Sequence, residues 1–361
     1  MYISKDDGAS WKKFQLNLPI VPITDLAIKD NDLIVATQGR SIYVLDDLTI
    51  LQEMNKEITN KDLHVFPVNP AYRMTGSPFA STFGAAPRNA GANPPRGAVI
   101  NYYAKNVADT TKASISILDK NRKLIRTYST DARENADKMQ IDKGLNQFVW
   151  NLQHPGADRV EGMILWNGTP GVITTAPGAH YAKIRVGKDS IEVPFEIKQN
   201  PNYKISAADY EAQMSFLTQV RDKFNEVQKG IKDIRAVRGQ INELTGRWGK
   251  ETPKEVKQFA DSINKKLTAI EETLYQTKSK SGQDPLNFPI RLNDKLSGLF
   301  DVVNSGNMAP SKQSKEVFAD LSAQSDAELA KLKQIMTDDL VKLNQLIREK
   351  SLPVIGVKKD G

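Results

Sequence analysis

The spacing of apolar residues changes once along the chain, close to residue 200. Up to that point apolar and polar residues alternate in short runs, which is the period of a β-strand. Beyond it, apolar residues recur every three or four positions, which is the period of an amphipathic helix. The pattern therefore predicts a multidomain β + α protein in which the β part comes first.

The first β runs, within residues 1–66, form a small meander. They are Met1–Ser4, Trp11–Leu16, Ile23–Ile28, Asp32–Thr37 and Ser41–Leu45, with turn sequences at Lys29-Asp30-Asn31 and Gln38-Gly39-Arg40. So few strands cannot cover their own edges. We therefore expect the meander to close against missing strands, a partner chain or the domain that follows.

Residues 67–97 are rich in Pro, Gly, Ala and Asn, and we interpret them as a connector. Tyr72, Phe79 and Phe83 indicate that this connector lies along a surface.

Residues 98–200 resume the two-residue period in six runs, Ala98–Ala104, Ala113–Leu118, Leu124–Tyr128, Asn146–Leu152, Ala179–Val186 and Ile191–Ile197. This spacing is typical of an immunoglobulin-like or fibronectin-like β-sandwich. Trp150 is its expected core anchor and Tyr181 a candidate corner residue. We expect His180 to be an exposed residue at a strand end.

Residues 205–350 predict four amphipathic helices joined by polar loops, arranged as an antiparallel four-helix bundle. Ser206 and Asp209 form a capping box at its start. The first apolar stripe comprises Leu217, Val220, Phe224, Val227, Ile231, Ile234, Ile241 and Leu244. We interpret the stripes as mutual core packing, and residues 351–361 as a tail.

Composition excludes several kinds of site. The 50 basic residues are interleaved with 43 acidic ones, so the net charge of +7 predicts a solvated surface and no nucleic-acid role. The absence of cysteine excludes disulfides and thiol chemistry, and the three histidines are too far apart to predict a metal site. No apolar run approaches the ~20 residues of a membrane span, and no motif predicts a cofactor.

A turn motif of the form S-x-D-x-G-x-x-W, the Asp box, opens the chain with Ser4, Asp6, Gly8 and Trp11. The Asp carboxylate accepts backbone N–H bonds inside the turn, Gly supplies a positive φ, and Trp packs under the loop. We assign these four residues a structural role.

The chain resembles the C-terminal part of exported bacterial sortilin/sialidase-type BNR-repeat proteins, often labelled glycosyl hydrolases. Besides the Asp box, the matching segments are Leu16–Pro19, Val35–Ser41, Val44–Leu48, Asn93–Ala98, Asn146–Leu152 and Phe288–Asn293. The resemblance implies terminal β-propeller blades, a sandwich and a helical domain. It also implies a secreted, periplasmic or cell-surface location, with a signal peptide and further blades in full-length relatives. Relatives often carry His where this chain has Gln38, so no acid–base role is carried over to that position.

Candidate catalytic residues are few. A glycosidase uses two carboxylates across a sugar, but Asp46 and Asp47 are adjacent on a strand end, so their side chains point to opposite faces. One of them is expected to cap the turn into Leu48-Thr49. A sialidase-type site uses an arginine cluster and a tyrosine nucleophile, for which Arg40 and Tyr43 are the candidates.

Three functions remain open from the sequence. The first is a non-catalytic segment that closes a propeller and supports or docks protein partners at the cell envelope. The second is part of a glycoside hydrolase that binds a glycan mainly through blades outside this chain. The third is a helical adaptor in which the bundle binds helices of another protein.

Overall fold

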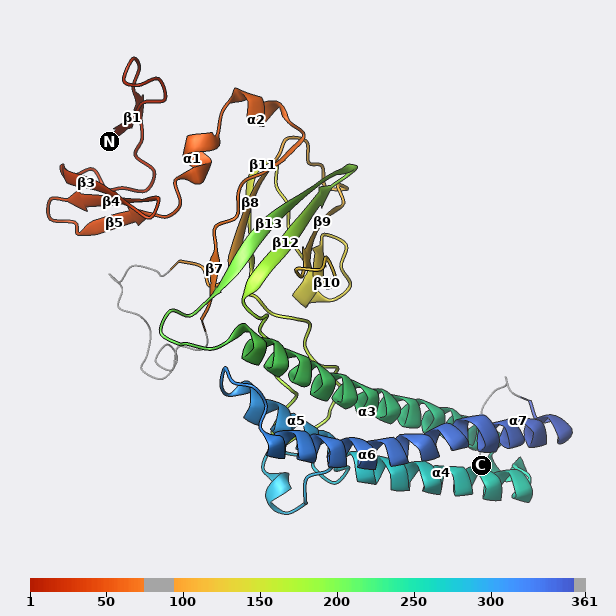
Figure 1. The fold of residues 1–361 in the computed structure, drawn as a ribbon. Coiled ribbons are helices and arrows are strands. Elements are labelled where there is room, and N and C mark those ends of the chain that lie inside the picture. Colours follow the sequence, from red (N-terminus) through yellow and green to blue (C-terminus); the bar gives the residue numbers. More distant parts are fainter. Residues whose placement is uncertain (75–93, 354–361) are drawn as a thin grey trace. The chain divides into compact units, whose positions relative to one another are not determined.

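The computed structural model describes residues 1–74 and 94–353. These residues fall into two compact units, one built from Met1–Leu152 with Pro177–Asn200 and the other from Gln153–Ala176 with the chain from Pro201 onward. The first unit contains β-sheets and two short helices, and the second is helical (Figure 1). The predicted β + α class is therefore confirmed.

The N-terminal strands form two small antiparallel sheets. Strands β1 (Tyr2–Ile3) and β2 (Lys12–Lys13) make a hairpin, and β3 (Ile23–Lys29), β4 (Asp32–Thr37) and β5 (Ile42–Leu45) follow as a meander. Asp30 and Asn31 both have positive φ, of 51° and 67°, as a two-residue turn between twisted strands requires. Two short helices, α1 (Thr49–Glu53) and α2 (Lys56–Asn60), lead into the next sheets.

Two further sheets share one hydrophobic core. Their orders are β10-β9-β12-β13-β7 and β11-β8-β6. The strands are β6 (Leu63–Val65), β7 (Ala71–Arg73), β8 (Ala98–Ala104), β9 (Ala113–Leu118), β10 (Leu124–Ser129), β11 (Gly144–Trp150), β12 (Gly178–Val186) and β13 (Asp189–Gln199). Trp150 is fully buried in this core, as predicted. His180 is also buried, between Trp150 and Phe195, so the expectation of an exposed strand-end residue was wrong. Its imidazole lies on the inward face of the alternating strand β12, where the aromatic rings surround it.

Two three-residue strands differ from the sequence-based division. β6 pairs with β8, although residues 1–66 were assigned to propeller blades, and β7 pairs in parallel with β13, although residues 67–97 were assigned to a connector. Strands this short show no measurable two-residue period. Tyr72 lies half-exposed on β7, whereas Phe79 and Phe83 lie outside the described residues.

Residues 153–176 also differ from the predicted division. They were included in the sandwich range of residues 98–200, yet they pack within the helical unit. Asp294 holds them there, because its carboxylate accepts hydrogen bonds from the backbone N–H groups of Trp166 (2.7 Å) and Asn167 (2.9 Å). This segment carries neither period, so its partner could not be read from its sequence.

The helices are α3 (Ala207–Trp248), α4 (Lys254–Leu274), α5 (Leu292–Asn304), α6 (Lys312–Gln334) and α7 (Leu340–Glu349), with a π-helical turn at Ile335–Asp339 between the last two. The Ser206 hydroxyl accepts the Asp209 backbone N–H at 3.1 Å, which confirms the predicted cap.

The helices form three rows instead of the four expected of a four-helix bundle. Along α3, contacts with α5 and then α4 run antiparallel, from Gln213 with Val303 to Arg235 with Glu271 and Asn242 with Asn264. Helices α4 and α5 therefore share one return row. Contacts with α6 and α7 run parallel to α3, through Phe216 with Phe318, Lys223 with Asp326 and Val237 beside Leu340. The 42 residues of α3 are long enough for both helices of the return row to pack along it.

Candidate functional site

The Asp-box hairpin between β1 and β2 is held by a closed set of local hydrogen bonds. The Ser4 hydroxyl donates to Asp6 Oδ1 at 2.9 Å and accepts the Gly8 backbone N–H at 2.8 Å. Asp6 Oδ1 accepts the Ser10 backbone N–H at 2.8 Å, and Oδ2 accepts the Ser10 hydroxyl at 2.5 Å. Every polar atom of the Asp6 carboxylate is thus committed to the turn.

These bonds also set the charge state of the turn. Hydrogen bonds to the carboxylate, above all from Ser10, lower the pKa of Asp6 below its usual value, so the charged form is favoured. Gly8 has a φ of +91°, which suits a residue without a side chain. Trp11 donates from Nε1 to the Gly8 carbonyl at 3.1 Å, yet 63% of its surface is exposed. Trp11 therefore braces the turn without being covered itself.

The sheet β3-β4-β5 carries apolar side chains on both faces. The strand register places Leu26, Ile28, Leu33, Val35, Tyr43 and Leu45 on one face. The other face carries Ala27, Ile34, Ala36, Ile42 and Val44, together with the charged residues Asp25, Lys29 and Asp32. Ile28 is 68% exposed and Val44 56% exposed. Among residues 1–47, Val35 alone is buried. A sheet with two apolar faces needs a layer on each side.

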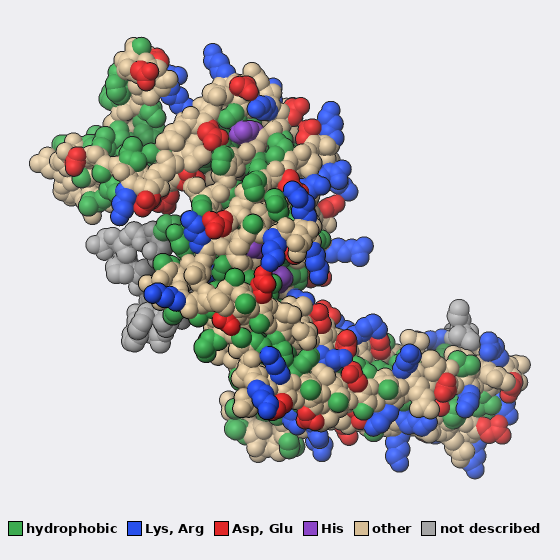
Figure 2. Space-filling model, in the orientation of Figure 1, with side chains coloured by type: hydrophobic (Ala, Val, Ile, Leu, Met, Phe, Trp, Pro, Cys, Tyr) green, Lys and Arg blue, Asp and Glu red, His purple; other side chains and the backbone are tan. Residues whose placement is uncertain are grey.

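The exposed apolar surface continues onto the Asp-box hairpin. Tyr2 and Trp11 lie with Ile23 and Leu26 around one wide hollow between the hairpin and β3. Figure 2 shows hydrophobic side chains at the surface of this N-terminal part. The uncovered surface of β1–β5, defined here as the N-terminal apolar surface, is the candidate functional site.

The structure does not gather the predicted catalytic candidates into one site. Arg40 and Asp47 lie beyond opposite ends of β5, a strand of four residues that spans roughly 13 Å. Tyr43 lies between them, on the face that carries Val35. A sialidase-type arginine cluster is also lacking, because Arg40 is the one arginine among residues 1–62.

Asp47 has a structural task at the end of β5. Its backbone N–H donates to Asp32 Oδ1 at 2.8 Å, and its own Oδ1 accepts from the Thr49 backbone N–H at 3.1 Å and from Asn31 Nδ2 at 3.3 Å. Its φ of 52° is one that Asp tolerates better than most residues. Partial burial, with a smaller effect of the Asp32 charge, raises the pKa of the neighbouring Asp46.

Across residues 1–74 and 94–353 no group of three His, Cys, Asp or Glu side chains could hold a metal ion. No helix within those ranges combines the length and apolarity needed to cross a membrane.

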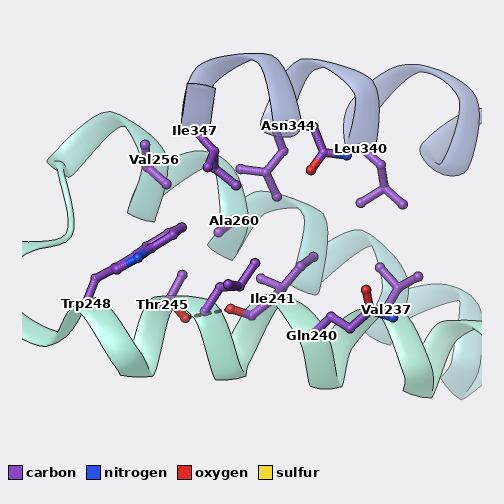
Figure 3. Close-up of a pocket in the computed structure, with 12 residues that line it drawn as sticks. Val237, Gln240, Ile241, Thr245, Trp248, Val256, Ala260, Leu340, Asn344 and Ile347 are labelled. Carbon is purple, nitrogen blue, oxygen red and sulfur yellow. Dashed lines mark hydrogen bonds between the residues drawn. The ribbon is translucent and has the colours of Figure 1, made fainter. Parts of the chain in front are cut away.

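The helical unit contains a small apolar cavity of about 90 Å³ between α3, α4 and α7. Figure 3 shows Ile241 and Trp248 of α3 facing Ala260 of α4 and Ile347 of α7. The small side chain of Ala260 leaves this layer underfilled. The Thr245 hydroxyl donates to the Ile241 carbonyl oxygen at 2.9 Å, so it offers no unpaired polar group to the cavity.

A second feature of the helical unit is a buried acid. The side chain of Glu271 is 4% exposed and accepts from Arg235 Nε at 2.8 Å and from Arg238 Nη1 at 2.6 Å. Arg235 also lies over the Tyr275 ring. We interpret this cluster as an ionic contact that joins α3 to α4, because the glutamate and both arginines belong to the bundle itself.

Sequence reasoning missed several residues that shape these sites. Ser10 completes the Asp box, and its position four residues after Asp6 was the available signal. Asn31 and Asp32 anchor Asp47, and both lie in or beside the predicted turn. Asp294 directly follows Phe288–Asn293, one of the segments on which the family resemblance rests. Its partners lie more than 120 residues away in the sequence, so no local pattern could reveal its role.

Comparisons with known proteins add little to this geometry. No protein-family profile matches the chain, and no curated protein matches it. A solved structure titled "pT26-6p" aligns with 76% of this chain and 48% of its own length, at 11% sequence identity and a TM-score of 0.15. The chain thus spans about half of that structure, and a TM-score this low supports no conclusion about fold or function.

Proposed function

We propose that this chain is a non-catalytic C-terminal segment of an exported BNR/sortilin-like protein. In this proposal β1–β5 supply terminal blade strands that close a β-propeller. The observation that supports the proposal is the N-terminal apolar surface, where a three-stranded sheet carries apolar side chains on both faces and residues 1–47 bury only Val35.

A propeller blade accounts for this pattern in physical terms. Each blade packs between two neighbouring blades, so both of its faces need apolar side chains. Most single-layer sheets of soluble proteins instead pair one apolar face with one polar face. Burying an Ile, Leu or Val side chain contributes about 1.5–3 kcal/mol. Leu26, Ile28, Ile42 and Val44, each at least half exposed, would together contribute several kcal/mol to docking.

The two downstream parts complete the proposal. The paired sheets of residues 63–152 and 177–200 are proposed to be an immunoglobulin-like sandwich, which fits their shared core and the buried Trp150. Together with the helices they would support the propeller or dock a protein partner at the cell envelope. Catalysis is not proposed for this chain, because Arg40, Tyr43 and Asp47 are separated along β5 and Asp47 is engaged in a turn.

The decisive experiment is to isolate the native protein from its source and to determine its intact mass and N-terminal sequence. We expect a polypeptide that extends upstream of Met1 and carries further S-x-D-x-G-x-x-W boxes. The proposal would also be supported by a separate subunit with such boxes that copurifies through residues 1–47. A native monomer that starts at Met1, and whose N-terminal apolar surface binds no hydrophobic dye, would contradict it.

A matched pair of variants links that result to the proposed surface. Replacing Ile28 by Asp places a charge on the N-terminal apolar surface, and we expect it to abolish association with further blades. Lys29 lies on the opposite face, where it pairs with Asp32, so this position is already charged. Replacing the exposed Lys29 by Asp should therefore leave association intact. Equal behaviour of the two variants would argue against a role for the apolar face.

A further inference from the structure

The cavity between α3, α4 and α7 has a lining without charge. Its floor is formed by buried apolar side chains from all three helices, Ile241, Trp248, Val256, Ala260, Leu343 and Ile347. Among the described residues that line it there is no Asp, Glu, Lys, Arg or His. A ligand that enters the cavity must therefore be uncharged there, because a charge would lose its hydration without gaining a partner.

Two exposed residues mark the mouth of the cavity. Gln240 of α3 and Asn344 of α7 are the exposed members of the described lining, and Figure 3 shows them on opposite walls. Each carries an uncharged amide, which can both donate and accept hydrogen bonds. An entering molecule can thus keep a hydroxyl group at the wet mouth while its apolar end goes inward.

Helix α7 is held at both ends, which keeps it from closing over the empty space. At its start, Asp339 Oδ2 accepts from Lys266 Nζ of α4 at 2.7 Å. Just past its end, the Pro353 carbonyl oxygen accepts from Trp248 Nε1 of α3 at 2.8 Å. Cavities persist where the surrounding structure relaxes only in part. The space beside Ala260 is therefore present before a ligand arrives, and little ordering has to accompany binding.

A π-helical turn precedes the α7 wall of the cavity. It covers Ile335–Asp339 and is followed by Leu340, Leu343 and Ile347, which line the cavity. Single π-helical turns within helices are rare and occur frequently at functional sites. The turn and the unfilled space are separate observations that indicate the same place in the helical unit.

The volume of the cavity sets the size of its ligand. An apolar cavity of about 150 Å³ in another protein binds benzene, which has six carbon atoms. In proportion, the cavity of about 90 Å³ has room for about four carbon atoms.

We propose that this cavity binds a short-chain aliphatic alcohol, with about four carbon atoms buried and the hydroxyl group at the mouth. The alkyl chain packs against Ile241, Ala260 and Ile347, and the hydroxyl group lies in water beside Gln240 and Asn344. A carboxylate or an ammonium of the same length fits less well, because no described residue of the lining carries a compensating charge. This inference concerns the helical unit and is independent of the propeller proposal.

Methyl NMR of the full chain with labelled isoleucine tests the proposal with the unbranched alcohols from ethanol to octan-1-ol. The δ1 methyl signals of Ile241 and Ile347 report on the cavity, and that of Ile115 in the core of the sheets is the internal control. We expect butan-1-ol to bind with a Kd in the millimolar range. Each added CH2 group up to butan-1-ol should strengthen binding about fourfold, because it buries one more methylene. Beyond pentan-1-ol the gain should stop, since further carbon atoms stay outside.

Three results of this titration would overturn the proposal. The first is a butan-1-ol titration that leaves Ile241 and Ile347 unchanged or shifts Ile115 equally. The second is a fourfold gain per CH2 group that continues to octan-1-ol, since the site would then hold a long chain. The third is equal binding of butan-1-ol, butanoate and butylammonium, because we expect the two ions to bind at least about tenfold more weakly.

Variants locate the binding within the cavity. Ala260→Leu fills the space and should abolish binding without loss of stability, whereas Ala269→Leu, at an exposed alanine of the same helix, should leave binding intact. Ile347→Val removes one methyl group from the wall, so it should raise the limit of chain length by about one carbon atom. That variant keeps the test if Ala260→Leu fails to fold. An unchanged limit in Ile347→Val, or wild-type affinity for butan-1-ol in a folded Ala260→Leu protein, would contradict the assigned site.

Discussion

One chemical change at two positions of the same sheet tests whether the faces of β3-β5 are open. Val35 on β4 is 2% exposed, and Val44 on the adjacent β5 is 56% exposed. Replacing Val by Thr keeps the shape and exchanges a methyl group for a hydroxyl. At Val35 the hydroxyl would be buried, which costs about 1–3 kcal/mol if it stays unpaired. At Val44 the hydroxyl reaches water, so we expect stability to change by less than about 0.5 kcal/mol.

Native-state hydrogen exchange of the β4 amides measures this difference, because it reports the free energy of local opening. We expect Val35→Thr to accelerate exchange by roughly tenfold or more, and Val44→Thr to leave it nearly unchanged. Binding of a hydrophobic dye provides a second readout, which should fall in Val44→Thr. Equal acceleration by both substitutions would refute the reasoning, since it would mean that Val44 is already covered. In an assembled propeller Val44→Thr should become costly, since both faces are then buried.

Three further predictions concern the rest of the chain. Gly97→Ala should lower the free energy of unfolding in urea by about 3 kcal/mol or more, because φ is +136° and a Cβ would lie 2.0 Å from the Trp150 carbonyl oxygen. Gly144→Ala is the control: φ is also positive there but the space around the Cβ is open, so we expect a loss of about 1–2 kcal/mol. Burial lowers the pKa of His180, so the unfolded chain takes up the proton first as the pH falls. Stability should therefore decrease below about pH 7.5, by at most about 1.4 kcal/mol per pH unit. His180→Phe should reduce that slope, and an unchanged slope would contradict the assignment. Asp294→Asn should lower stability by about 2–3 kcal/mol and expose the Trp166 amide to exchange, whereas Asp261→Asn on the surface of α4 should do neither.

Periodicity alone located most of the regular elements. The runs Asp32–Thr37, Ala98–Ala104 and Ala113–Leu118 coincide with β4, β8 and β9 residue for residue. These strands are long enough for alternation to be visible, and the inward residues of β8 and β9 fill a core. β6 and β7 are three residues long and were missed, since partners far along the chain select them.

The helices illustrate a different limit. Their apolar stripes predicted each helix, because a stripe depends only on neighbouring turns. The arrangement in three rows depends on helix lengths and on contacts such as Arg235 with Glu271, which join residues 36 positions apart. A stripe states that a face is buried but does not state which helix covers it. The count of four helices therefore suggested four rows, although two helices share one.

The candidate sites likewise differ in whether local sequence or distant contacts define them. Asp6 and Gly8 could be recognised because a turn is local and its motif is contiguous. The contacts of Asp294 could not, because the backbone N–H groups of Trp166 and Asn167 that it accepts lie more than 120 positions away in the sequence. Functional hypotheses from such a chain therefore need both kinds of evidence.

The contrast in burial within the first unit supports the view that β1–β5 belong to a larger assembly. The paired sheets of residues 63–152 and 177–200 bury a set of large side chains that includes Trp150, Tyr102 and Ile184. Residues 1–47 bury Val35 alone, although their content of Leu, Ile, Val, Trp and Tyr is sufficient for a core. Ordering each residue costs about 1–2 kcal/mol of conformational entropy, so one buried valine cannot offset the ordering of this segment. Apolar residues that alternate onto both faces of an ordered sheet acquire their stabilising role when two further layers cover them. The apolar surface that remains exposed is therefore the part of this chain from which an assembly partner can best be inferred.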